Sequence, residues 1–157
     1  MKKVSNKESG FTIIEVVLVL AIAGLIFLVV FLALPALQRS QRDTQRRSDL
    51  GRMLASLEKY AANNNGTYPT AASMNGTFVP NYMTNGGSSW ADPQTGSTYT
   101  VTAYTAAVTG EPAGVIYYNT NRTCGATEGT MTAGGGTRSV AAITLLENGL
   151  AYCQDNR

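Results

Sequence analysis

The sequence predicts an α+β protein in which a long N-terminal α-helix packs on a four-stranded antiparallel sheet. Two observations lead to this fold class. From Val16 to Leu34 no residue is polar, and an amphipathic pattern continues this apolar run to about residue 62. After residue 98 the chain is instead rich in β-branched and aromatic residues that alternate with others. A chain of this length holds one modest domain beside such a helix.

The apolar run is long enough to cross a membrane. At about 1.5 Å per residue, a helix from Val16 to Leu34 reaches roughly 28 Å, which matches a hydrocarbon core. No small-residue cleavage site for a signal peptidase follows the run. Instead, Pro35 is followed by more helix-favouring sequence. We therefore expect the run to stay on the mature chain. The simplest interpretation is a plain single-span membrane protein.

A motif at the start of the run makes a narrower prediction. Lysines, a glycine, a phenylalanine and a glutamate stand in a fixed order: Lys2, Lys3, Lys7, Gly10, Phe11 and Glu15. This arrangement resembles the class III signal of type IV prepilins. In that family a membrane peptidase cuts after the glycine and methylates the new amino terminus. The resemblance implies that the leader, residues 1–10, is removed by cleavage between Gly10 and Phe11, and that Phe11 becomes N-methylated.

Glu15 is the one charge at the leading edge of the apolar run. An acidic residue at the centre of a membrane helix costs about 2.5–3.5 kcal/mol on translocon-type scales, so a partner is expected. The resemblance implies that the new amino group of Phe11, in the same or a neighbouring subunit, is that partner and sets the register of a filament. A structural alternative is that Glu15 only complements the helix dipole, which is worth about 0.3–1 kcal/mol.

Residues 11–37 are therefore predicted to form a transmembrane and filament-core helix, and residues 38–62 its amphipathic half. Apolar residues recur at helical spacing in the second half: Leu50, Met53, Leu54, Leu57 and Ala61. We expect this stripe to pack on the sheet and Gly66 to end the helix. Gly24 and Pro35 interrupt the helix, and two interpretations stay open: a kink, or local unwinding when the helix enters a filament.

Residues 63–97 are predicted to be a connecting loop, with Trp90 anchoring it and a turn at 92–96. The sheet is predicted within residues 98–157. Its four strands are expected at 98–105, 114–119, 139–145 and 150–153, with turns at 110–112 and 147–149.

Cys124 and Cys153 are the two cysteines of the chain. An exported head lies in oxidising surroundings, which favour a disulfide between them over two free thiols. For a loop of this length the chain-entropy estimate is about 3.6 kcal/mol. The resemblance implies the same bridge, because pilins commonly carry a disulfide-bridged C-terminal loop.

Composition argues against an enzyme. Histidine is absent, and the sequence contains no nucleophile-elbow motif, phosphate loop or clustered carboxylates. No cofactor or metal is predicted. Weak calcium candidates are scattered along the chain: Asp92, Glu147, Asp155 and Asn156. The net charge of +2 resides in the leader, so the remaining chain has no basic surplus, and the sequence makes no prediction for nucleic acid.

The resemblance implies a structural function: the major pilin of a bacterial type IV pilus, polymerising through residues 11–37. Its partners would be copies of itself, the prepilin peptidase, and the assembly platform and ATPase. The precursor is expected in the inner membrane as a single pass with its head outside, and the processed chain in an extracellular pilus. The positive-inside rule does not give this orientation, because lysines precede the apolar run and arginines follow it. The orientation is instead what the resemblance implies. A type II secretion pseudopilin and a minor or tip pilin acting as adhesin or DNA-uptake receptor are alternatives.

Overall fold

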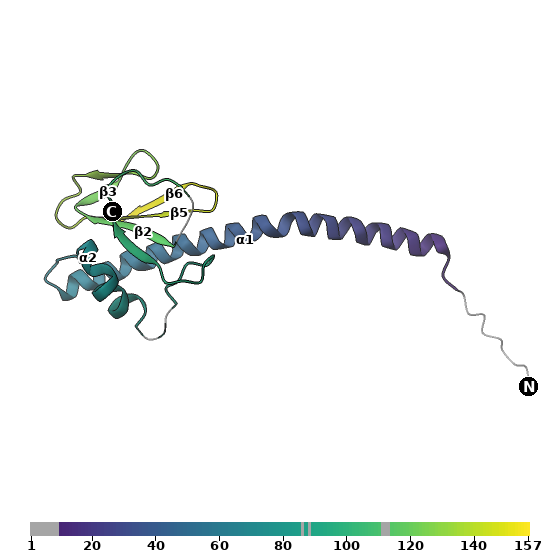
Figure 1. The fold of residues 1–157 in the computed structure, drawn as a ribbon, viewed down its shortest axis with the longest axis horizontal. Coiled ribbons are helices and arrows are strands. Elements are labelled where there is room, and N and C mark those ends of the chain that lie inside the picture. Colours follow the sequence, from purple (N-terminus) through teal and green to yellow (C-terminus); the bar gives the residue numbers. More distant parts are fainter. Residues whose placement is uncertain (1–9, 86, 88, 111–113) are drawn as a thin grey trace, which may run out of the picture. The chain divides into compact units, whose positions relative to one another are not determined.

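A computed structural model describes residues 10–85, 87, 89–110 and 114–157 (Figure 1). Residues 1–9 of the predicted leader, with its three lysines, and residues 111–113, which include part of one predicted turn, lie outside this description. The helices are α1 (Ile13–Asn63), the short α2 (Ala71–Ser73) and the π-helix η1 (Met74–Met83). The strands are β1 (Thr100–Ala103), β2 (Val115–Thr120), β3 (Arg122–Cys124), β4 (Met131–Ala133), β5 (Val140–Leu145) and β6 (Ala151–Asp155).

The chain divides into two compact units, of which one ends at Gln38 and the other begins at Arg39. We call residues 11–37 the apolar stem and residues 39–157 the head unit. α1 includes both Gly24 and Pro35 within its helical span. The two interpretations, a kink and local unwinding in a filament, therefore both stay predictions.

The main sheet of the head unit is mixed. Its four strands lie in the order β1-β2-β5-β6. The pairs β2–β5 and β5–β6 are antiparallel, as predicted, and the turn after β5 is closed by the Leu146 N–H donating to the Leu150 carbonyl at 2.8 Å. β1 and β2 run parallel. The prediction of a wholly antiparallel sheet was therefore wrong at this one pairing.

The connection between β1 and β2 explains the parallel pairing. A tight turn returns a strand antiparallel, whereas parallel neighbours need a longer crossover. In its described part, residues 104–110, this connection crosses one face of the sheet, where Tyr104 and Val108 are buried against β5. The Val108 N–H donates to the Gly129 carbonyl at 2.8 Å, which ties the crossover to the segment between β3 and β4.

The opposite face of the sheet packs on α1. The predicted apolar stripe is buried, with Leu50, Met53 and Leu57 fully excluded from solvent. It contacts inward side chains of β2 and β5: Ile116, Tyr118, Val140 and Ala142. Burying each such side chain contributes about 1.5–3 kcal/mol, so this stripe carries much of the stability of the head unit. The predicted packing of helix on sheet is confirmed.

β5 is covered on both faces. Alternate residues of a strand point to opposite sides, and those facing away from α1 contact the crossover and Met131 of β4: Ala141, Ile143 and Leu145. Every residue from Val140 to Leu145 is buried as a result. The run V-A-A-I-T-L is apolar nearly throughout, as expected for a strand between two layers.

Residues 63–97 contain more regular structure than a loop. α1 ends as predicted, with Gly66 at a φ of 78° and its N–H donating to the Ala61 carbonyl at 2.7 Å. α2 and η1 follow, and η1 buries Phe78 and Met74 in the core shared with α1. Trp90 is 2% exposed, and its ring centroid lies 4.8 Å from that of Tyr99. Trp90 therefore anchors this segment on the head unit.

Candidate functional site

Thr12 and Glu15 cap the start of α1. The N–H and the hydroxyl of Thr12 both donate to Glu15 Oε2, each at 2.8 Å. In return, the Glu15 N–H donates to Thr12 Oγ1 at 3.3 Å. This reciprocal arrangement is a capping box, and it satisfies N–H groups that the helix itself leaves unbonded. Sequence reasoning missed it, although the Thr-x-x-Glu spacing before an apolar run is a signal for it.

The predicted cleavage site lies directly before this cap. Gly10 and Phe11 precede the first residue of α1, and the Phe11 side chain is 88% exposed. A Cβ added at Gly10 would meet nothing within 4 Å among the described residues. The peptide bond between the two residues is thus accessible and outside the helix, as cleavage by a peptidase requires.

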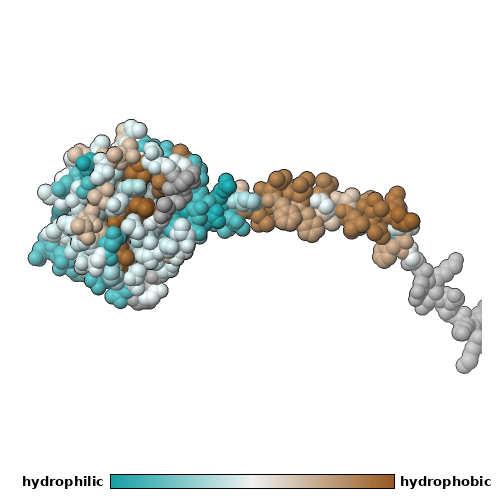
Figure 2. Space-filling model, viewed as in Figure 1, coloured by the Kyte–Doolittle hydropathy of each residue, from teal (hydrophilic) through white to brown (hydrophobic). Residues whose placement is uncertain are grey.

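The large apolar side chains of the stem are exposed (Figure 2). Among the described residues, α1 is the one helix long and apolar enough to cross a membrane, and none of its most apolar part is buried. An apolar surface of this extent marks contact with lipid or with another protein. Glu15 lies on it, beside a recess of about 300 Å³ that is otherwise lined by Phe11, Val16, Val19 and Leu20.

The head unit contains a group of charged residues around Arg46 of α1. Arg46 is only 1% exposed. Its Nε donates to Asp92 Oδ2 at 2.7 Å, and its Nη2 to Asp92 Oδ1 at 3.3 Å and Gln94 Oε1 at 3.1 Å. Its Nη1 donates to Asp43 Oδ1 at 3.1 Å and Glu147 Oε1 at 3.2 Å. Every donor of the guanidinium group is therefore satisfied.

Asp92 joins Arg46 to the predicted turn at 92–96. Its Oδ1 accepts the N–H groups of Gln94 at 3.0 Å and Thr95 at 3.1 Å, and Gly96 has the predicted positive φ, at 69°. Burial alone would raise the pKa of Asp92, but the hydrogen bonds from Arg46 and from the turn hold that pKa below its ordinary value. Asp92 is therefore a buried carboxylate that stays charged.

Glu147, in the turn between β5 and β6, is held by two arginines of α1. Arg42 Nη2 donates to Glu147 Oε2 at 2.7 Å, and Arg42 Nε and Arg46 both contact Oε1. The Glu147 N–H donates to Asp43 Oδ1 at 2.9 Å. The hydrogen bond from Arg42, followed by that from Arg46, lowers the pKa of Glu147. This group of charges fixes two turns of the head unit to one stretch of α1.

Asp49 lies one helical turn further along α1 and is 3% exposed. It accepts hydrogen bonds from Tyr99 Oη at 3.2 Å and Gln45 Nε2 at 3.1 Å, and Arg52 Nη2 lies 3.3 Å away. Here burial outweighs the favourable contacts and raises the pKa of Asp49. Asp49 therefore opposes the effect of Asp92 and Glu147 on the pH dependence of stability.

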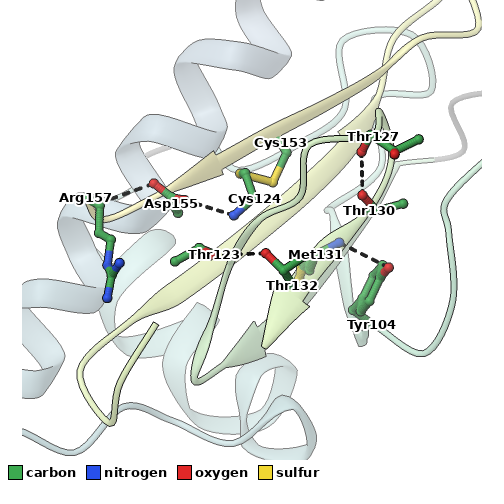
Figure 3. Close-up of a disulfide and its surroundings, with 10 residues drawn as sticks. All are labelled: Tyr104, Thr123, Cys124, Thr127, Thr130, Met131, Thr132, Cys153, Asp155 and Arg157. Carbon is green, nitrogen blue, oxygen red and sulfur yellow. Dashed lines mark hydrogen bonds between the residues drawn. A yellow bond between two sulfur atoms is a disulfide. The ribbon is translucent and has the colours of Figure 1, made fainter. Parts of the chain in front are cut away.

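Cys124 of β3 and Cys153 of β6 form the predicted disulfide (Figure 3). The Cys124 N–H also donates to Asp155 Oδ2 at 2.9 Å. Beside the bridge, the Met131 N–H donates to Tyr104 Oη at 3.1 Å. The antiparallel strands β3 and β4 form a hairpin, and the disulfide fastens this hairpin to β6.

The weak calcium candidates all have protein partners. Asp92 and Glu147 bind arginine, Asp155 accepts the Cys124 N–H, and Asn156 Oδ1 accepts the Val140 N–H at 3.0 Å. Among the described residues, no three His, Cys, Asp or Glu side chains are grouped to hold a metal ion.

Residues 5–31 match the family model described as the prokaryotic N-terminal methylation motif. The match spans the Gly10–Phe11 bond, the capping box and most of the apolar stem. No curated protein and no solved structure was found to be similar to the chain. The motif implies processing by a prepilin peptidase and assembly into a pilus-type polymer, and the exposed apolar helix fits a membrane-anchored precursor. The methylation motif, and the long apolar helix that begins within it, are consistent with a type IV pilin-like protein.

Proposed function

We propose that this chain is the precursor of the major subunit of a type IV pilus. Cleavage between Gly10 and Phe11 frees an amino group on Phe11, which is then methylated. The stems of successive copies pack into the core of a filament, and the head units form its surface. The observation that supports this most is the methylation motif on a stem whose large apolar side chains are exposed. Cell-surface exposure of the filament belongs to the same proposal.

The charge of Glu15 favours transfer of the stem from the membrane into a filament. Apolar side chains gain little on moving from lipid to a bundle of stems, because both surroundings are apolar. A carboxylate in hydrocarbon costs about 2.5–3.5 kcal/mol, and a partner cation relieves that cost. Thr12 engages Glu15 Oε2, and Oε1 accepts no hydrogen bond from the described residues. We infer that Oε1 receives the amine of Phe11 from the same or a neighbouring copy.

Mass spectrometry of the N-terminal peptide in sheared surface material tests the proposal. The chain should begin at Phe11 and carry one additional methyl group. A Gly10→Val variant serves as the control, because a β-branched residue at the cut should leave the leader attached. An intact leader on wild-type protein, with all protein in the membrane fraction, would mean a plain membrane anchor. A processed chain without surface filaments would reject the major-pilin assignment and favour a pseudopilin.

Variants at the capping box separate the charge of Glu15 from its cap. Glu15→Leu loses both, and should be cleaved but assemble poorly. Glu15→Gln keeps a side chain that can complete a capping box and loses the charge alone. Thr12→Val removes the hydroxyl and keeps the charge. If the charge sets the register, filament yield falls in both Glu15 variants and much less in Thr12→Val; normal yield from Glu15→Gln would contradict this.

A further inference from the structure

β1 is an edge strand of the main sheet. Its backbone groups alternate between β2 and the open side. The Thr100 N–H donates to the Gly114 carbonyl just before β2, and the Tyr104 N–H donates to the Tyr118 carbonyl within β2. The N–H and the carbonyl of Val101 therefore point away from β2. An open edge of this kind is a template for pairing with a strand of another chain.

Asn75, the second residue of η1, occupies the open side at Val101. Its Oδ1 accepts the Val101 N–H at 2.8 Å, and its Nδ2 donates to the Val101 carbonyl at 2.7 Å. A carboxamide offers a donor and an acceptor side by side, as a residue of a neighbouring antiparallel strand does. Asn75 thus makes both of the hydrogen bonds that an incoming strand would make with Val101.

Other contacts protect the two edges of the sheet in the same sense. Just before β1, Thr98 forms a β-bridge with Ala91. On β6, the strand at the opposite edge, the Ala151 N–H donates to the side chain of Glu128. Natural sheets use covering segments and charged side chains at such positions to prevent edge-to-edge association.

We propose that Asn75 closes the free edge of β1 against strand pairing with a second copy of this chain. Copies then associate through their stems while their sheets stay separate. The proposal rests on the proposed function in one respect: a filament holds neighbouring head units at a high effective concentration, at which even weak edge pairing would compete with correct packing. The closure itself is a property of the folded head unit.

Amide hydrogen exchange and particle size, measured on the purified full chain in detergent, test the proposal. Asn75→Ala should speed exchange in peptides covering β1 by about tenfold, because the Val101 N–H loses its acceptor. At rising protein concentration this variant alone should form larger species, and exchange in β1 should slow again as the edges pair. Asn81→Ala is the matched control: Asn81 is exposed on the same π-helix, and its side chain makes no hydrogen bond within the described residues.

A second variant separates edge pairing from loss of stability. Asn75→Asp keeps an acceptor for the Val101 N–H and places a negative charge on the edge, so it should stay at wild-type size. Asn75→Ser replaces the alanine variant if that chain fails to fold. Unchanged exchange in Asn75→Ala, faster exchange without larger species, or equal association of Asn75→Asp would each overturn the proposal. Hydrogen exchange and particle size in detergent depend on neither leader removal nor filament formation. Failure of the proposed function would therefore leave both measurements unchanged.

Discussion

Replacing Arg46 with methionine should strongly destabilise the head unit. Methionine keeps a long side chain at a position that is 1% exposed, but it removes the guanidinium group. Asp92, which is equally buried, would lose both hydrogen bonds from Arg46 and its counter-charge. The N–H groups of Gln94 and Thr95 would still bind it.

The size of the loss in stability depends on how deeply Asp92, the partner of Arg46, is buried. Breaking a buried ion pair from one side costs about 3–5 kcal/mol, because the remaining charge is uncompensated. Since Asp92 keeps its two turn N–H donors, we expect the lower end of this range, about 3 kcal/mol. A domain of this size has a free energy of unfolding of about 5–15 kcal/mol, so the loss is a large part of the total.

Urea unfolding of the full chain in detergent, followed by tryptophan fluorescence, measures this change. Trp90 is the single tryptophan and lies buried beside Tyr99, so its emission reports on the head unit. Arg47→Met is the control, because Arg47 is exposed and its guanidinium lies 5.4 Å from the Tyr152 ring centroid. Such an exposed cation–π contact is worth about 0.5–1 kcal/mol.

A double variant tests whether the loss arises from the unpaired carboxylate. Adding Asp92→Asn to Arg46→Met removes the uncompensated charge and should restore about 1–2 kcal/mol of the free energy of unfolding. The reasoning would be refuted if Arg46→Met cost no more than Arg47→Met. It would also fail if Asp92→Asn made the Arg46→Met protein less stable still.

Three further predictions concern the same unit, each read from urea unfolding. The pKa of Glu147 is lowered in the folded state, so its contribution to the free energy of unfolding is present above about pH 4.5 and is lost as the pH falls through the folded pKa. The wild-type protein should therefore lose stability on acidification more steeply than Glu147→Gln. Equal slopes of stability against pH for the two proteins would contradict this. Gly129→Ala should cost about 2 kcal/mol or more, since φ is 71° and a Cβ would lie 2.4 Å from a carbonyl oxygen of the β1–β2 connection, whereas Gly76→Ala, with nothing described within 4 Å, should cost far less. Reducing the Cys124–Cys153 bond should lower the free energy of unfolding by about 3–4 kcal/mol, and an unchanged urea midpoint under reductant would argue against this value.

Sequence patterns with a local physical cause predicted much of this protein. The apolar run and the stripe from Leu50 to Ala61 are set by helical periodicity, and Gly66 ends α1 because glycine takes a positive φ readily. The four strands of the main sheet were found because β-branched and aromatic residues mark them. The direction of β1 relative to β2 was not predictable in this way. It depends on where the crossover packs, and the contacts of Tyr104 and Val108 are with residues distant in the sequence.

The burial of Arg46 shows the same limit at the candidate site. Arg46 lies four residues before Leu50, so helical spacing does place it on the buried stripe. Its charge hid this, because a run such as Q-R-D-T-Q-R-R is typical of a solvent-facing helix surface. The residues that neutralise it stand 46 and 101 positions away, at Asp92 and Glu147.

Those partners also explain why arginine, and not leucine, continues the stripe at this point. Along the stripe from Leu50, strands of the sheet cover α1 with apolar side chains whose backbone groups are already paired. At Arg46 the cover consists of turns, at 92–96 and 147–149, and turns bring acidic side chains with them. A leucine there would leave Asp92 buried without a cation and Glu147 with Arg42 alone, whereas a guanidinium group with five donors binds both carboxylates and keeps the turns in place. Turns and helix are thus fixed together close to Arg39, where the head unit begins.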